Sequence, residues 1–150
     1  MTQSSGYVVL IVEDSPDHVA LIKIVFEHFD KSAHITTTHS AEEAITHIAG
    51  PWPDSDFGRD DYPDVIVLDI NMEGIGGLGF LKWYSEQPNL RHLPVVVFTS
   101  SGDPDLEREC RALGAHDFKQ KPNDFSELVP VVQRALAQWQ AKDQQQPGVG

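Results

Sequence analysis

The residues with the clearest chemical potential lie in the stretch VIVLDINMEGIGG, residues 65–77, where an apolar run ends at Asp69 and a polar, glycine-rich segment follows. The spacing of Asp69, Asn71 and Glu73 fits the first half of an EF-hand calcium loop. Such a loop needs a bidentate glutamate at its twelfth position, where this chain has Phe80, and it follows a helix rather than a β-branched run. The stretch therefore predicts a buried strand that ends at a candidate nucleophile or metal ligand.

Further segments of strand and helix character alternate along the chain. Short runs that are apolar almost throughout are typical of strands buried on both faces of a parallel sheet. Four segments share this character or a weaker form of it: 7–12, 33–38, 94–99 and 115–119. Together with the run before Asp69 they predict five strands that alternate with five helices. The sequence thus predicts an α/β doubly wound domain with a five-stranded parallel sheet.

Capping residues and apolar spacing indicate where the helices begin and which faces they bury. Ser15-Pro16 predicts a cap with proline at the first helical position, and Ser40 with Glu43 has the spacing of a capping box. In the fifth helix, Pro130 is a candidate kink. The buried face of the first helix is predicted from the residues that repeat at helical spacing: Ala20, Leu21, Ile24, Val25 and Phe29.

Polar residues follow four of the predicted strands. Glu13 and Asp14 follow the first, Asp69 the third, Thr99 ends the fourth, and Lys121 lies just beyond the fifth. In doubly wound domains, ligands bind outside the carboxyl ends of the strands. We therefore expect these side chains to meet at one edge of the sheet.

The combination of these residue types favours phosphoryl chemistry. Three carboxylates at one place repel one another unless a cation neutralises them, and Mg²⁺ suits an open site of carboxylates, water and phosphoryl oxygens. A lysine and a threonine hydroxyl can hold further phosphoryl oxygens, and a carboxylate can itself be the nucleophile. Asp69, at the end of a central strand, is the candidate nucleophile.

Taken together, these motifs resemble the signature of the response-regulator receiver domain of bacterial two-component signalling. The resemblance covers residues 7–140 and implies a CheY-like, flavodoxin-like fold with strand order 2-1-3-4-5. It implies that Asp69 accepts a phosphoryl group from a histidine kinase and that Mg²⁺ is the cofactor. The metal ligands would be Glu13, Asp14, Asp69 and the backbone carbonyl of Asn71.

The same resemblance assigns roles to residues beyond the metal ligands. Lys121 would pair with the phosphoryl group, and Thr99 and Phe118 would rearrange as switch residues. Pro122 is a candidate for a cis peptide bond. Asn71 and Ser101 would tune slow self-hydrolysis, so the chain would be a phosphoacceptor rather than an enzyme.

The chain departs from the family pattern at several positions, and two alternative functions stay open. Glu73 replaces a common proline, Gly76-Gly77 replaces a frequent Asp-Gly, and Phe118 lacks a tyrosine hydroxyl. One alternative is a receiver-fold scaffold that is never phosphorylated, which the glycine-rich loop supports. The other is an aspartyl-phosphate phosphatase, which usually has a second aspartate where this chain has Asn71.

Composition limits the partners and the compartment. The chain has 150 residues with 11 basic and 23 acidic side chains, for a net charge of −12, which disfavours nucleic-acid binding. Cys110 is the single cysteine and the N-terminus has neither a signal peptide nor a membrane span, so we expect a cytoplasmic protein.

The remaining segments suggest how the chain signals. Residues 1–6 form an N-terminal tail, residues 50–63 are an acidic insertion before the third strand, and 141–150 read as a disordered tail. We therefore expect a stand-alone receiver that signals by protein contacts, with a possible homodimer through the face of helix 4, strand 5 and helix 5. The insertion is similar to that of regulators paired with phytochrome-type sensor kinases.

Overall fold

A computed structural model describes residues 6–49 and 62–144, without the side chains of 139–144. The strands are β1 (Tyr7–Val12), β2 (Ala33–Thr38), β3 (Val65–Leu68), β4 (Val95–Thr99) and β5 (Asp117–Gln120). The helices are α1 (Pro16–Phe29), α2 (Ala41–Ala49), α3 (Gly76–Ser85), α4 (Pro104–Ala112) and α5 (Leu128–Gln144), with short 3-10 turns η1 (Pro88–Leu90) and η2 (Phe125–Glu127). The predicted insertion, except Tyr62 and Pro63, lies outside the described residues.

All neighbouring strands are parallel, and their order is β2-β1-β3-β4-β5, which confirms the predicted sheet. The register aligns the carboxyl ends of the inner strands, because Val12 pairs with Leu68 and Leu68 pairs with Val97. At the rim, Thr99 pairs with Gln120. The residues that follow these strands therefore emerge side by side.

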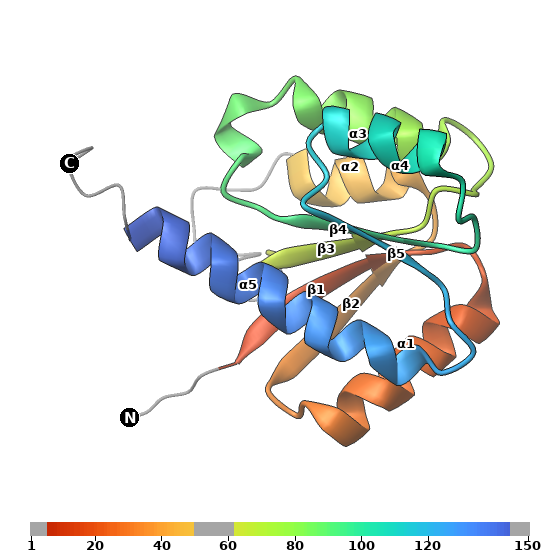
Figure 1. The fold of residues 1–150 in the computed structure, drawn as a ribbon, viewed down its shortest axis with the longest axis vertical. Coiled ribbons are helices and arrows are strands. Elements are labelled where there is room, and N and C mark those ends of the chain that lie inside the picture. The colour runs from red at the N-terminus through yellow and green to blue at the C-terminus, as the bar shows by residue number, and fades with distance from the viewer. Residues whose placement is uncertain (1–5, 50–61, 145–150) are drawn as a thin grey trace.

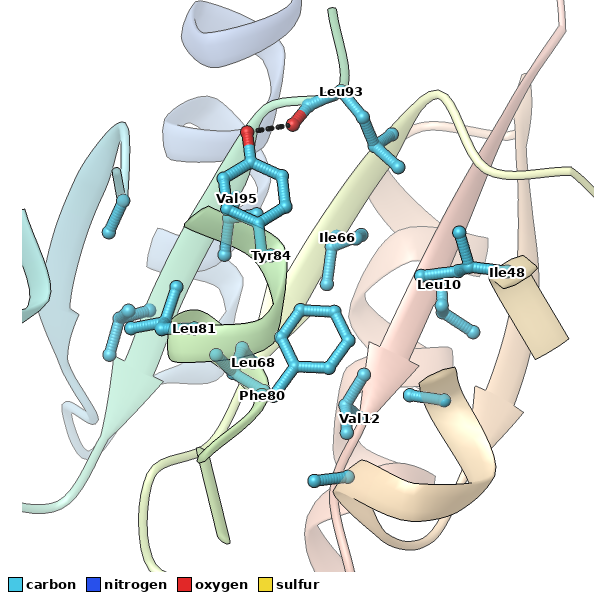
Figure 2. Close-up of a cluster of buried hydrophobic side chains, with 14 of the residues drawn as sticks. Leu10, Val12, Ile48, Ile66, Leu68, Phe80, Leu81, Tyr84, Leu93 and Val95 are labelled. Atoms are coloured by element: carbon cyan, nitrogen blue, oxygen red, sulfur yellow. Dashed lines mark hydrogen bonds between the residues drawn. The ribbon is translucent and has the colours of Figure 1, made fainter. Parts of the chain in front are cut away.

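Helices cover both faces of the sheet, with α2, α3 and α4 on one face and α1 and α5 on the other (Figure 1). Successive residues of the central strands point to opposite faces of the sheet. Ile66 packs on the face covered by α2, α3 and α4, and Val67 packs on the face covered by α1 and α5. Figure 2 shows the first face, where Phe80 of α3 lies over β3 and the Tyr84 hydroxyl donates to the carbonyl of Leu93 at 2.7 Å.

The buried face of α1 differs from the predicted one. Val19, Ile22 and Phe26 are buried, whereas Leu21 and Ile24 are 44% and 58% exposed. The predicted residues Ala20 and Phe29 are also exposed, and Val25 is half-buried. The helix carries two apolar stripes at helical spacing, and periodicity alone cannot say which stripe meets the sheet.

The predicted helix starts are confirmed. The Ser15 side chain accepts a hydrogen bond from the His18 backbone N–H at 3.3 Å, with Pro16 at the first helical position. Ser40 accepts from the Glu43 backbone N–H at 3.0 Å, and the Glu43 side chain accepts from the N–H of His39 at 2.9 Å. These contacts satisfy backbone donors that helix ends leave free.

Two details of the C-terminal part differ from prediction. The Lys121–Pro122 bond is trans, since the described residues contain no cis peptide bond. X-Pro isomers differ by only about 0.5–1 kcal/mol in a free chain, so a sequence does not decide between them. The helix α5 continues to Gln144, past the predicted start of the tail at residue 141. Pro130 lies in its first turn, where a missing N–H costs no helical hydrogen bond.

No helix in the described ranges combines the length and the apolar character needed to cross a membrane.

Candidate functional site

Three carboxylates meet at the carboxyl edge of the sheet, as predicted. Each of Glu13, Asp14 and Asp69 offers one oxygen, and these oxygens lie within 4.8 Å of one another. Backbone hydrogen bonds continue the strands into the site, because the N–H of Asp69 donates to the carbonyl of Val12 at 3.0 Å. The ends of β1 and β3 therefore fix where these acidic side chains start.

Two of these carboxylates are almost completely removed from solvent. Glu13 is 2% exposed and Asp69 is 4% exposed, whereas Asp14 is exposed. Burial, followed by the charge of Glu13, raises the pKa of Asp69 to about 6, although Lys121 and the Asn71 N–H act in the opposite direction. The carboxylates thus repel one another in a way that a divalent cation relieves, and an all-oxygen donor set fits a hard cation such as Mg²⁺.

Lys121 supplies the positive charge of the site. Its ammonium lies 2.7 Å from Oε1 of Glu13 and 3.7 Å from Oδ2 of Asp69, and its side chain is 6% exposed. The Lys121 N–H donates to the carbonyl of Thr99 at 2.7 Å, which holds the lysine backbone against the end of β4. The ammonium also lies 5.9 Å from the centroid of the Phe98 ring.

Thr99 connects the loop that follows Asp69 with the loop after β4. Its hydroxyl, fully buried, accepts from the side-chain amide of Asn71 and from the N–H of Ser101, each at 3.5 Å. The Asn71 N–H in turn donates to Oδ1 of Asp69 at 3.3 Å. A chain of hydrogen bonds therefore links the predicted Ser101, Thr99 and Asn71 to Asp69.

Phe118 lies on β5 opposite Val97 and packs, half-buried, against the cluster under α2, α3 and α4. In this arrangement it is a core residue, and its switch role stays a prediction.

The glycine-rich loop after Asp69 has a geometric explanation. Gly74 and Gly76 have φ angles of +78° and +70°, which side chains rarely adopt. A Cβ on Gly77 would lie 2.5 Å from the carbonyl oxygen of Asp69 and 2.6 Å from the Cα of Ile70. These glycines allow α3 to start directly against Asp69, so they do not support the scaffold alternative.

The comparison with known families agrees with this geometry. The family model described as "Response regulator receiver domain" matches residues 9–133. The chain belongs to this family. It is accordingly a receiver domain of two-component response regulators, in which sensor histidine kinases phosphorylate the receiver.

Two curated relatives show how far the similarity extends. The receiver is 39% identical over 85 residues to the DNA-binding transcriptional regulator NtrC of Escherichia coli (strain K12), which covers 57% of this chain but only 17% of NtrC. It is 28% identical over 129 residues to the polar-differentiation response regulator DivK of Brucella ovis, covering 85% of this chain and 94% of DivK.

Solved structures share the fold. The phosphorylated cyanobacterial phytochrome response regulator RcpA superposes with a TM-score of 0.73 at 22% identity, covering 92% of this receiver and 96% of that chain. The Mn²⁺-bound form of the response regulator Rcp1 gives a TM-score of 0.70 at 23% identity, with 85% and 90% covered.

The site contains a residue that sequence reasoning missed. His18 contacts the Lys121 ammonium through Nδ1 at 2.8 Å. The seven histidines of the sequence are scattered and lack the spacing of metal ligands. The feature that could have indicated a role for His18 is its position in the first turn of the helix that follows Glu13 and Asp14.

Proposed function

We propose that this receiver accepts a phosphoryl group on Asp69 from a sensor histidine kinase, with Mg²⁺ held in the acidic cluster. The observation that carries the proposal is the arrangement of two buried acids, one exposed acid and a lysine with a 6% exposed side chain at the carboxyl end of the sheet. These side chains come from three separate parts of the sequence, Glu13-Asp14, Asp69 and Lys121, and converge only in the fold.

The chain's own residues account for each part of the transfer. Asp69, as a carboxylate, attacks the phosphorus of a phosphohistidine, so that a P–O bond forms while the P–N bond breaks and the imidazole leaves. Lys121 would pair with a phosphoryl oxygen, and the Thr99 hydroxyl would donate to another. The carboxylates of Glu13, Asp14 and Asp69 and the carbonyl of Asn71 would hold Mg²⁺, which offsets the charge of the transferred group when bound.

We propose that the chain is a phosphoacceptor and not an enzyme that turns over a substrate. Self-hydrolysis of the aspartyl phosphate would be slow. Asn71 and Ser101, which both donate hydrogen bonds to the Thr99 hydroxyl, would set its rate.

The output of the receiver would be a contact surface. Asp117 of β5 pairs with Arg111 of α4 at 3.4 Å and with Arg134 of α5 at 3.2 Å, so one carboxylate ties together the three elements of this face. Phe118 follows Asp117 directly, and Thr99 lies on the neighbouring strand, so a change at either residue is close to this network. This supports the α4-β5-α5 face as the surface that forms a homodimer or meets a target.

The kinase that we propose is of the phytochrome type, acting in the cytoplasm. The supporting observation is the shared fold with RcpA, a phytochrome response regulator, over nearly the whole of both chains.

The test is intact-mass analysis after incubation with acetyl phosphate and Mg²⁺. We expect one phosphoryl adduct, lost in Asp69→Asn and in the presence of a chelator. A folded wild-type protein that gives no adduct and binds no beryllofluoride would leave the scaffold alternative. Steady turnover of an added phosphomonoester would indicate the phosphatase instead.

A further inference from the structure

His18 contacts the charged centre of the site from the first turn of α1. Its Nδ1 lies 2.8 Å from Nζ of Lys121 and 3.9 Å from Oε1 of Glu13. An ammonium has donors but no acceptor, so Nδ1 must accept the hydrogen bond. In this contact Lys121 is therefore the donor and Nδ1 of His18 is the acceptor.

His18 is held in place by a backbone hydrogen bond and by a ring contact. Its backbone N–H donates to the Ser15 side chain at 3.3 Å, at the cap of α1, and the Ser15 N–H donates to Oε2 of Glu13 at 3.1 Å. Its ring lies edge-on to Phe125, with 5.4 Å between centroids and 63° between planes. With a side chain 36% exposed, His18 is anchored without being part of the core.

The Lys121 ammonium divides its hydrogen bonds unevenly. It donates to Glu13 and to His18, while Oδ2 of Asp69, at 3.7 Å, is beyond hydrogen-bond distance. If Glu13 bound a cation, His18 would be the hydrogen-bond acceptor left to the lysine.

We propose that His18 is a positioning residue that holds Lys121 in its resting place, a proposal that rests on the function proposed above. To reach a phosphoryl oxygen on Asp69, the ammonium has to move toward Asp69 and exchange His18 for the new partner. The hydrogen bond to His18 therefore stabilises the unphosphorylated arrangement. The free energy that it contributes is lost when a phosphoryl group binds, so the hydrogen bond weakens that binding.

Removing the acceptor should strengthen the binding of a phosphoryl analogue. A net hydrogen bond to a charged group corresponds to a factor of about tenfold or more in an equilibrium constant. We expect His18→Phe, which keeps a ring against Phe125 but has no acceptor, to bind beryllofluoride about tenfold more tightly than wild type. His18→Asn keeps an acceptor atom at the position of Nδ1 and should bind as wild type does.

The experiment is a titration of wild type, His18→Phe and His18→Asn with beryllofluoride at saturating Mg²⁺, followed by Trp fluorescence or by NMR. His18→Ala serves as a second acceptor-free variant if His18→Phe does not fold, and thermal melts check that each variant is folded. Tighter binding in the acceptor-free variants with wild-type affinity in His18→Asn supports the proposal.

Two results overturn it in different ways. If wild type binds beryllofluoride and all variants bind equally, or if His18→Asn changes as much as His18→Phe, the acceptor has no positioning role while the proposed function stands. If wild type binds no beryllofluoride, the proposed function itself is wrong and the role of His18 is lost with it.

Discussion

The ammonium of Lys121 lies 2.7 Å from Oε1 of Glu13, a contact between residues 108 positions apart in sequence. The lysine thus makes its closest ion pair with a predicted metal ligand rather than with the predicted nucleophile. In the metal-free state the Asp69 carboxylate is therefore left poorly compensated, and the stability and metal dependence of the protein should reflect this imbalance.

Asp69→Asn should stabilise the metal-free protein at pH 7. The substitution removes a buried charge that lies beside Glu13, and from a pKa raised to about 6 we expect a gain on the order of 2 kcal/mol in the free energy of unfolding. Urea unfolding in a chelator measures it. Asp14→Asn, at an exposed position, is the matched control and should gain less; equal or lower stability of Asp69→Asn would contradict the argument.

The contribution of Asp69 to the stability of metal-free wild type should fall as pH rises between about 4 and about 6. The unfolded chain releases the Asp69 proton near the ordinary pKa of 3.8, whereas the folded chain keeps it until about pH 6. In this window the folded state binds more protons, so raising the pH favours unfolding. The measurement is the difference in unfolding free energy between Asp69→Asn and wild type, which should grow across the window. A difference that is constant with pH would show that Asp69 is not responsible.

Mg²⁺ should raise the melting temperature of wild type in a concentration-dependent way, because a ligand that binds the folded state stabilises it by mass action. Glu13→Gln removes one carboxylate of the cluster and should shift this dependence to roughly tenfold or higher Mg²⁺ concentrations. Glu73→Gln, an exposed change on the following loop, is the control and should leave the dependence unchanged. An unshifted response of Glu13→Gln would remove Glu13 from the ligand set.

Gly77→Ala should slow labelling by acetyl phosphate and lower stability. Its new methyl group would lie 2.5 Å from the carbonyl oxygen of Asp69, so the backbone of Asp69 or the start of α3 has to shift. We expect a loss of about 1–3 kcal/mol in stability together with at least tenfold slower labelling. Gly102→Ala is the control, because the atoms that its Cβ meets belong to the exposed side chain of Gln120. Labelling of Gly77→Ala at the wild-type rate would show that the loop adapts without moving Asp69.

The exposed apolar stripe of α1 leads to a prediction about the kinase. Leu21 and Ile24 face solvent on the helix that begins beside Glu13, where a phosphodonor has to approach. The double change Leu21→Ser and Ile24→Ser should slow phosphotransfer from a purified sensor kinase about tenfold, since both apolar contacts are lost, and should leave acetyl phosphate labelling unchanged. Phe29→Ser, on the same helix but at its far end, is the control. Equal transfer rates would mean that the kinase docks elsewhere.

Much of this arrangement follows from the chain's local patterns. The carboxyl ends of parallel strands share one edge, so the strand pattern alone is enough to group Glu13, Asp69 and Lys121. The capping of α1 by Ser15 is likewise a local interaction, readable from two adjacent residues.

What could not be predicted depends on how helices rotate and lean against the sheet. The buried stripe of α1, with Val19 and Ile22, has the same spacing as the exposed one, and only packing selects between them. The contact of His18 with Lys121 depends on that same rotation. A rotation of α1 about its axis that buried the other stripe would carry the imidazole away from the lysine.

The position of β5 at the rim of the sheet determines how the contacts among Glu13, Asp69 and Lys121 are lost in local unfolding. Glu13 and Asp69 extend interior strands, whereas Lys121 extends a rim strand that is hydrogen-bonded on one side only and is nowhere fully buried (Figure 1). A local opening of this rim requires less free energy than global unfolding. It moves the Lys121 ammonium away while Glu13 and Asp69 stay in place. The amide of Lys121 should therefore exchange with solvent deuterium sooner than the amide of Asp69, so that the unbalanced acidic centre exists as a rare, short-lived member of the native ensemble.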